Sequence, residues 1–290
     1  MEFETRAIHA GQEPDPLTGS VNVPIYQTST YAQDGVGAMR GGHDYARTIN
    51  PTRTALEQCL ASLEGAEYGL AFASGMSAIA AILELLSPGQ LTMAVNDVYG
   101  GTYRLFSKVL APKGYRFAFA DLATPIGLSE IATQRPDMVW IETPTNPLLK
   151  VLDIRAIADA THAAGGLLVV DNTFASPYLQ QPLELGADLV VHSTTKYIGG
   201  HSDVVGGFAG TSDPAMGERL RFLQNSLGAV PAPLDCFLIH RGLRTLHLRM
   251  EAHARSAAAV VELLRATPEV EDVRWPGFSG MVSFRHPRAT

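Results

Sequence analysis

The stretch Leu167-Leu168-Val169-Val170-Asp171-Asn172-Thr173 is a short apolar run that ends in a carboxylate, an amide and a hydroxyl. Comparable apolar runs lie at residues 68–73, 91–95, 117–120, 138–141 and 189–191, and segments with helical periodicity separate them. Uniformly apolar runs of this length are typical of strands that are buried on both faces. Their alternation with helices predicts an α/β fold with a mostly parallel sheet sandwiched by helices.

The chain of 290 residues has three predicted parts: the domain that contains this sheet, a segment before it and a segment after it. Residues 1–53 are rich in Gly, Pro, Thr and Tyr without a sustained period, so we expect an arm that packs on another surface. Residues 54–232 form the predicted α/β domain. Residues 233–290 begin with a long helix that runs to about residue 266 and bends at Gly242, followed by a strand at 281–284.

The composition favours a small-molecule ligand. The net charge of -7 comes without a basic stripe, which argues against nucleic acid as a partner. Cys59 and Cys236 lie far apart and outside any metal-ligand spacing, so we expect no metal, no disulfide framework and a reducing, cytoplasmic location. Residues 1–11 lack the apolar core of a secretory signal, and polar residues interrupt the apolar stretch 68–86, so no membrane span is expected.

Ligands of open α/β sheets bind just beyond the carboxyl ends of strands, and four such places carry suitable residues. The first is Ser74-Gly75-Met76-Ser77, which follows a predicted strand and opens a helix. Free backbone N–H groups and the positive end of the helix dipole could hold a phosphate there. An ordinary Ser cap with a tight turn is the structural alternative.

Two further strand ends carry charged groups. Asp171 at the end of a buried strand needs a positive partner, and a protonated pyridine nitrogen would serve. The structural alternative is that the Asp171 side chain caps the following loop. In Ser193-Thr194-Thr195-Lys196 the hydroxyls can bind a phosphate while Lys196 reaches an aldehyde carbon and forms a Schiff base. An exposed lysine after a strand is the alternative there.

The fourth place is Asp97-Val98-Tyr99-Gly100-Gly101-Thr102, in which glycines follow an aromatic ring. The ring of Tyr99 could stack on a planar ligand, or it could be a core tyrosine beside a turn. Together the four strand ends offer an anion seat, a ring platform, a partner for a pyridine nitrogen and an amine.

These stretches resemble the Cys/Met-metabolism enzymes that depend on pyridoxal 5'-phosphate (PLP), which include cystathionine γ-lyase and cystathionine γ-synthase. Further matching stretches are Tyr45-Ala46-Arg47, Asn50-Pro51-Thr52, Glu142-Thr143-Pro144-Thr145-Asn146-Pro147, Gly200-His201-Ser202-Asp203 and Arg241-Gly242-Leu243. The resemblance runs from about residue 3 to residue 277 and implies PLP fold type I, the fold of aspartate aminotransferase.

The resemblance also implies roles for particular residues. Lys196 would be the Schiff-base lysine and proton shuttle, Asp171 the anchor of the pyridine nitrogen, and Tyr99 the stacking ring. The remaining implied cofactor-binding residues are Gly75, Met76, Ser193 and Thr195 for the phosphate, Thr173 beside Asp171, Asn146 near the phenolic oxygen, and Tyr45 and Arg47 toward the phosphate of a neighbouring subunit. Tyr45, Tyr99 and Lys196 would be the catalytic residues. A shared site of this kind implies a homo-oligomer, a dimer of dimers.

The implied reaction is γ-elimination or γ-replacement on a small amino-acid substrate. Gly101 stands where methionine γ-lyases have a cysteine, which disfavours that activity. The stretches 140–144 and 223–231 are most similar to cystathionine γ-lyase, whereas 43–45 and 103–106 are similar to the γ-synthase, and we expect the lyase.

The chain departs from the family pattern after Pro276-Gly277, where family members continue into a longer C-terminal domain that supplies an arginine for the substrate carboxylate. The sequence therefore predicts a truncated C-terminal domain, and it leaves open a PLP-binding scaffold without this substrate clamp. An unrelated PLP enzyme of the same fold, such as an aminotransferase or a cysteine desulfurase, is the third interpretation. The stretches Tyr45-Ala46-Arg47 and Gly200-His201-Ser202-Asp203 argue against it.

Overall fold

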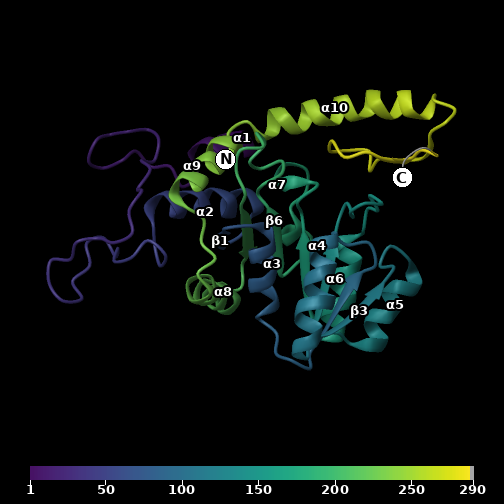
Figure 1. The fold of residues 1–290 in the computed structure, drawn as a ribbon, viewed down its shortest axis with the longest axis horizontal. Coiled ribbons are helices and arrows are strands. Elements are labelled where there is room, and N and C mark those ends of the chain that lie inside the picture. Colours follow the sequence, from purple (N-terminus) through teal and green to yellow (C-terminus); the bar gives the residue numbers. More distant parts are fainter. Residues whose placement is uncertain (288–290) are drawn as a thin grey trace. The chain divides into compact units, whose positions relative to one another are not determined.

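The computed structural model describes residues 1–287 (Figure 1). Within these residues, seven strands form one sheet in the order β1-β7-β6-β5-β4-β2-β3. β2 runs parallel to β3 and β4, and β4 runs parallel to β5, while β7 is antiparallel to β1. The predicted α/β fold with a mostly parallel sheet is thus confirmed. The chain folds into two compact units, and β6 (Leu189–Ser193) contributes residues to both.

The first unit comprises Met1–Leu85 and Val191–Thr245. Its elements are α1 (Phe3–His9), α2 (Pro51–Glu64), β1 (Tyr68–Phe72), α3 (Gly75–Leu83), β7 (Gly207–Thr211), α8 (Pro214–Leu227) and α9 (Pro233–Leu243). A Cβ on Gly69 would lie 2.6 Å from the Glu57 carbonyl of α2, and a Cβ on Gly217 of α8 would lie 2.4 Å from the ring of Tyr68. Because neighbouring strand residues point to opposite faces, α2 and α8 cover opposite faces of β1.

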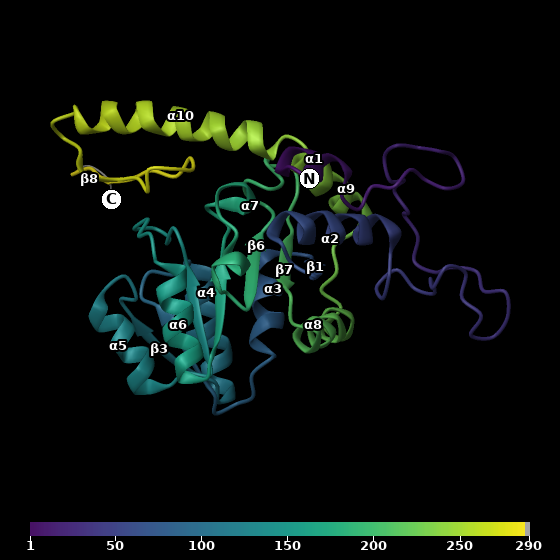
Figure 2. The same ribbon diagram turned by 180° about the vertical axis from the view of Figure 1, so that it is seen from behind.

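The second unit comprises Leu86–Val190 and the chain from Leu246 onward. Its elements are β2 (Leu91–Val95), α4 (Gly100–Arg104), η1 (Leu105–Leu110), η2 (Ala111–Lys113), β3 (Arg116–Ala120), α5 (Pro125–Gln134), β4 (Met138–Glu142), α6 (Ile154–Ala164), β5 (Leu167–Asp171), α7 (Ser176–Leu179), η3 (Pro182–Leu185), α10 (Leu246–Arg265), β8 (Glu271–Arg274) and β9 (Ser283–Arg285). Helices α5 and α6 lie side by side, as Figure 2 shows from behind. β4 is buried along its whole length, with Trp140 at 1% exposure.

Each of the six predicted strands is present, and its bounds differ from the expected ones by two residues or fewer. The predicted long helix is two helices, since α9 ends at Leu243 and α10 begins at Leu246. The break lies just beyond Gly242, where a Cβ would come within 2.3 Å of the Gly199 carbonyl. The strand expected at 281–284 is β9, and its partner β8 was not predicted.

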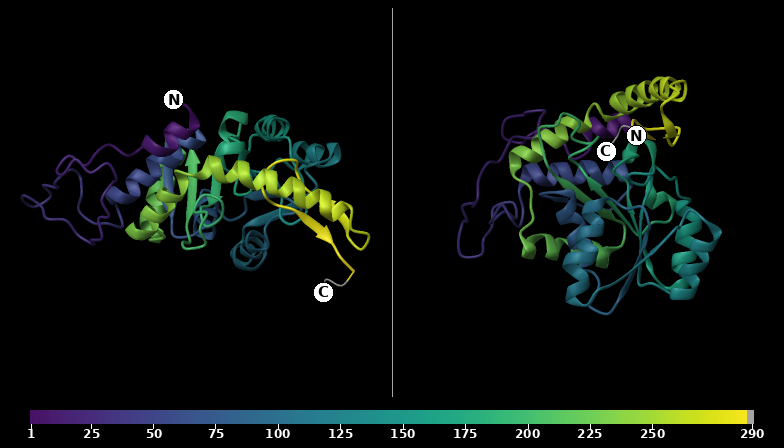
Figure 3. Two further views of the ribbon diagram at one scale, coloured as in Figure 1. Left: turned by 90° about the horizontal axis from the view of Figure 1, so that it is seen from above. Right: turned by 45° about the vertical axis from the view of Figure 1, so that its right-hand side comes forward.

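The N-terminal segment is more structured at its ends than the sequence indicates. Residues 3–9 form α1, and α2 begins at Pro51 behind the Asn50 cap, whose side chain accepts hydrogen bonds from the N–H groups of Thr52 and Arg53. Between α1 and α2 the chain makes an extended excursion away from both helices, drawn in purple in Figure 3. The division at 1–53, 54–232 and 233–290 stays a prediction.

Both cysteines lie buried in the first unit. Burial raises the pKa of the Cys59 thiol to about 12 and that of the Cys236 thiol to about 12. Among the described helices, none combines the length and apolar character that a membrane crossing requires.

Candidate active site

The turn between β1 and α3 forms a narrow cradle at the start of a helix in the first unit. Ser74 and Ser77 make a reciprocal cap, because Ser74 Oγ accepts from the Ser77 N–H at 3.1 Å while Ser77 Oγ accepts from the Ser74 N–H at 3.0 Å. The N–H groups of Gly75 and Met76 precede the first bond within the helix and point out of its positive end. A Cβ on Gly75 would lie 2.8 Å from the Cβ of Ser193, so only glycine fits without a shift.

Lys196 lies in the turn that follows β6 and is exposed. Its N–H donates to the Ser193 carbonyl at 3.3 Å, and its carbonyl accepts from the Gly200 N–H at 2.8 Å. The hydroxyl of Thr195 accepts from the Gly206 N–H at 3.1 Å and lies 3.3 Å from the Gly206 carbonyl. Thr195 therefore ties the lysine turn to the segment that leads into β7, a backbone role that the sequence did not indicate.

Tyr45 and Arg47 lie together on the excursion between α1 and α2. The Arg47 guanidinium lies 5.4 Å from the centroid of the Tyr45 ring, and it donates to the Asn225 carbonyl at 2.6 Å. Both side chains are exposed. The buried Arg53 donates to the carbonyls of Ala46, Arg47 and Thr48 at 2.8, 3.1 and 2.9 Å. Arg53 thus fixes this stretch, and nothing in the sequence marks it as buried.

In the second unit, Asp171 is the last residue of β5 and is 7% exposed. Its Oδ1 accepts from the Thr173 N–H at 3.0 Å and from the Thr173 hydroxyl at 2.6 Å. Two donors on one oxygen stabilise a carboxylate charge in a buried position. The pairing of Asp171 with Thr173 is therefore suited to a cationic ring nitrogen.

Glu142 is the register partner of Asp171 on the neighbouring strand β4. Burial, and next the charge of Asp171, raise the pKa of Glu142 well above its usual value. The raised pKa favours the protonated, neutral form of Glu142 more than in an ordinary carboxyl group. Its Oε2 accepts from the Tyr99 N–H at 2.7 Å. In the sequence, Glu142 stands out only as one letter of a longer motif.

The loops that carry Tyr99 and Asn146 are tied together by a second carboxylate. Asp97 Oδ2 accepts from the Thr145 hydroxyl at 2.5 Å and from the Leu148 N–H at 2.9 Å, on either side of Asn146. Tyr99 occupies the N-cap position of α4 without a capping bond from its side chain and is 48% exposed, and Asn146 is half-buried. The expected ring platform and the expected amide are therefore neighbours in one hydrogen-bonded loop cluster.

The structure brings the candidate residues together in separate groups within each unit. The first unit joins the Gly75 cradle to Ser193 and holds Tyr45 beside Arg47, while the second unit joins Asp171 to Thr173 and Tyr99 to the Asn146 loop. A cradle that admits no Cβ suits a phosphate, and a buried carboxylate held by two donors suits a protonated pyridine. The residues present thus fit PLP.

The chain matches the family model of the Cys/Met metabolism PLP-dependent enzymes over residues 4–287. It belongs to this family. Its cofactor is PLP, as in the rest of the family. The match covers nearly the whole chain and confirms the resemblance drawn from the motifs.

Named relatives of the family are about half identical to this chain over the aligned residues. The probable cystathionine γ-synthase of Herpetosiphon aurantiacus is 54% identical, over 95% of this chain and 86% of its own. The cystathionine γ-lyase of Dictyostelium discoideum is 52% identical, over 94% of this chain and 70% of its own. Other relatives are named cystathionine β-lyase.

A solved structure of a relative confirms the fold of the chain. The crystal structure of metB from Corynebacterium glutamicum superposes with a TM-score of 0.96 at 46% identity, covering 99% of this chain and 79% of that one. The chain therefore has the family's PLP fold type I, and the family assignment narrows its chemistry to the metabolism of cysteine and methionine.

Proposed function

We propose that this protein is a PLP-dependent carbon–sulfur lyase that converts cystathionine and water into cysteine, 2-oxobutanoate and ammonia. The observation that supports it most is the buried Asp171 carboxylate with both Thr173 donors on Oδ1. PLP, when bound, supplies an electron sink that acidifies the substrate carbon next to the amino group, and the sink works best with its ring nitrogen protonated. Holding that proton is the task that we assign to Asp171, with Thr173 as its support.

Lys196 is the proposed proton carrier. Its Nζ, on a flexible stem in the exposed turn after β6, can take a proton from the carbon beside the amino group and deliver it elsewhere. Loss of a group from the γ-carbon requires a second proton to leave from the β-carbon, so one mobile amine serves both steps. Lys196 is therefore the residue whose loss should abolish turnover.

The remaining residues bind and orient. Gly75 and Met76 offer backbone N–H groups to the phosphate, joined by the hydroxyls of Ser193 and Thr195. Tyr99 supplies the stacking face and Asn146 the amide for the phenolic oxygen. Tyr45 and Arg47 reach the phosphate held by a second copy, so the proposed enzyme is a homo-oligomer, a tetramer built as a dimer of dimers. Its proposed location is the cytoplasm.

Cystathionine γ-synthase is the second candidate, and a specific observation favours it. The relative with 54% identity carries that name, and residues 43–45 and 103–106 resemble the synthase. The lyase is favoured by residues 140–144 and 223–231 and by a relative with 52% identity. Both reactions use the same two proton removals, and they differ in whether water or an incoming thiol completes the cycle.

The test measures products rather than rates alone. The purified holoenzyme is incubated with cystathionine, and separately with O-succinylhomoserine and cysteine. We expect 2-oxobutanoate and cysteine from the first mixture, whereas cystathionine formed only in the second would establish the synthase. Pyruvate with homocysteine would indicate β-elimination and overturn the proposal. Lys196→Ala is the control, which should lose both turnover and the visible absorbance band that borohydride removes from the wild type.

A further inference from the structure

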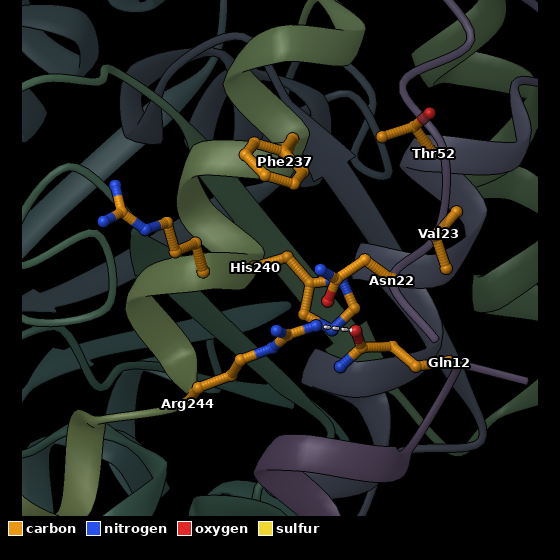
Figure 4. Close-up of a pocket in the computed structure, with 8 residues that line it drawn as sticks. Gln12, Asn22, Val23, Thr52, Phe237, His240 and Arg244 are labelled. Atoms are coloured by element: carbon orange, nitrogen blue, oxygen red, sulfur yellow. Dashed lines mark hydrogen bonds between the residues drawn. The ribbon is translucent and has the colours of Figure 1, made fainter. Parts of the chain in front are cut away.

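A pocket of about 140 Å³ lies within the first unit, and none of the residues proposed to bind PLP lines it (Figure 4). It is lined by Gln12, Asn22, Val23, Thr52, Phe237, His240, Arg241 and Arg244. The lining comes from the chain that follows α1, from the start of α2 and from α9 with the residue just beyond it. None of the eight residues carries a carboxylate, whereas two carry a guanidinium, so the pocket is electropositive.

His240 is buried in this pocket with one ring nitrogen unused. The residue is 6% exposed, and its Nε2 has no hydrogen-bond partner among the described residues. Burial, together with the nearby Arg244 charge, lowers the pKa of His240 to about 4. At neutral pH the ring is therefore neutral and can present an N–H at Nε2. A buried donor without a partner costs free energy, so its presence at a cavity wall points to a ligand acceptor.

Arg244 presents a second unused donor beside His240. Its terminal nitrogen donates to Gln12 Oε1, and Gln12 Nε2 in turn donates to the Ile8 carbonyl of α1 at 2.6 Å. This chain of hydrogen bonds fixes the guanidinium, while its buried Nε has no partner among residues 1–287. A fixed cation with a free N–H suits an oxygen acceptor that is itself negatively charged.

We propose that this pocket binds a small oxyanion of the carboxylate class through Arg244 Nε and His240 Nε2, with Arg241 adding charge at the rim. The volume admits a group of a few heavy atoms, and Val23 and Phe237 can contact a short apolar tail. The carboxylate comes either from a free small molecule or from an acidic side chain of a second copy of this chain. No lining residue belongs to the proposed PLP site, so this inference goes beyond the proposed function and does not depend on it.

The test uses the holoenzyme and selenate as the probe anion, with acetate as the carboxylate. Isothermal titration compares the wild type with Arg244→Met and His240→Leu. Arg219→Met is the matched control, because Arg219 is an exposed arginine of α8 in the same unit. We expect the two pocket variants to bind at least roughly tenfold more weakly, the loss typical of one hydrogen bond to a charged group. The control should bind like the wild type.

Crystals of the wild-type holoenzyme grown with selenate provide a measurement that does not depend on variant folding. An anomalous peak within hydrogen-bond distance of Arg244 Nε and His240 Nε2 supports a free anion as the ligand. An Asp or Glu of a second copy in the same position supports the other source, and Arg244→Met should then reduce the oligomeric mass in light scattering. A pocket that holds only water, or unchanged affinity in both variants, overturns the proposal.

Discussion

Glu142 and Asp171 are neighbouring carboxyl groups on β4 and β5, and the raised pKa of Glu142 has a consequence for stability. The unfolded chain releases the Glu142 proton near its ordinary pKa of 4.5, while the folded chain retains it. Stability is therefore lost as pH rises above 4.5 toward the folded pKa. Glu142→Gln does not titrate, so we expect its melting temperature, measured by scanning calorimetry, to gain on that of the wild type progressively as the pH rises above 4.5.

Two substitutions of Glu142 distinguish the effect of its titration from the effect of its hydrogen bond to Tyr99. Gln still offers an oxygen to the Tyr99 N–H, whereas Glu142→Leu leaves that donor without its partner at 2.7 Å. We expect Glu142→Leu to weaken PLP binding by about tenfold or more, and Glu142→Gln to leave it nearly unchanged, in absorbance titrations of the apoenzyme. A melting-temperature difference between Gln and Glu that is constant with pH would show that Glu142 is charged in the folded chain.

At Gly75, the addition of a single methyl group is expected to lower both the stability of the fold and the affinity for PLP. Alanine in a helix usually stabilises by reducing the freedom of the unfolded chain, by about 0.4–1 kcal/mol. Here the new Cβ would meet the Cβ of Ser193 at 2.8 Å and its Cα at 3.0 Å, neither of which can swing away. The clash, about 1–3 kcal/mol, should win. We expect Gly75→Ala to unfold at lower urea and to bind PLP more weakly.

Gly35→Ala is the matched control for this change. A Cβ there would meet only the Ala38 Cβ, at an ordinary 3.8 Å, so its stability should stay within about 0.5 kcal/mol of the wild type. If both variants behave alike, the approach of Gly75 to Ser193 is not what requires glycine.

At the scale of elements, the start of α3 depends on the reciprocal bonds between Ser74 and Ser77. Removing the cap with Ser74→Ala should cost about 1 kcal/mol of unfolding free energy in urea titrations. Ser77→Ala should cost a similar amount, and the double variant less than the sum, because the two hydroxyls serve one motif. Ser87→Ala, an exposed serine outside the helix, should be neutral. Full additivity would contradict the reciprocal cap.

The elements that sequence reasoning missed share a physical cause. β7 contains Gly207 and Gly210, and glycine in a strand argues against strand structure. Gly207 is needed there because a Cβ would lie 2.2 Å from the Ser74 carbonyl, a contact between residues far apart in the chain. β8 was missed for a related reason, since it is short and is stabilised by pairing with β9. The local sequence pattern predicts strands and helices that bury their own apolar residues. It does not predict elements that form because of contacts with residues far away in the sequence.

At the scale of the whole molecule, the same distinction applies to the candidate site. Asp171, Tyr99 and Lys196 could be singled out as candidates because each follows an apolar run, and the position at a strand end is itself local. Arg53 and Glu142 could not, because their importance depends on burial and on partners elsewhere in the chain. Glu142 acts on Tyr99 across 43 residues, and one sequence gives no measure of that distance.

The excursion between α1 and α2 leads to a prediction about assembly. Leu17, Val21 and Val36 are at least 75% exposed, and within residues 12–50 the described strand pairing is limited to isolated bridges. An arm with so little support of its own and so many exposed apolar side chains is expected to be covered by a second copy.

The test of this assembly prediction adds charge to the arm. Val36→Asp combined with Met39→Asp should lower the molar mass of the protein in size-exclusion chromatography with light scattering. PLP affinity should fall with it, because Tyr45 and Arg47 would lose the phosphate that they are proposed to reach. Ile126→Asp, at an apolar position of α5 that is 75% exposed, is the control for added charge. A double variant that keeps both the mass and the PLP affinity of the wild type would mean that the arm serves its own subunit.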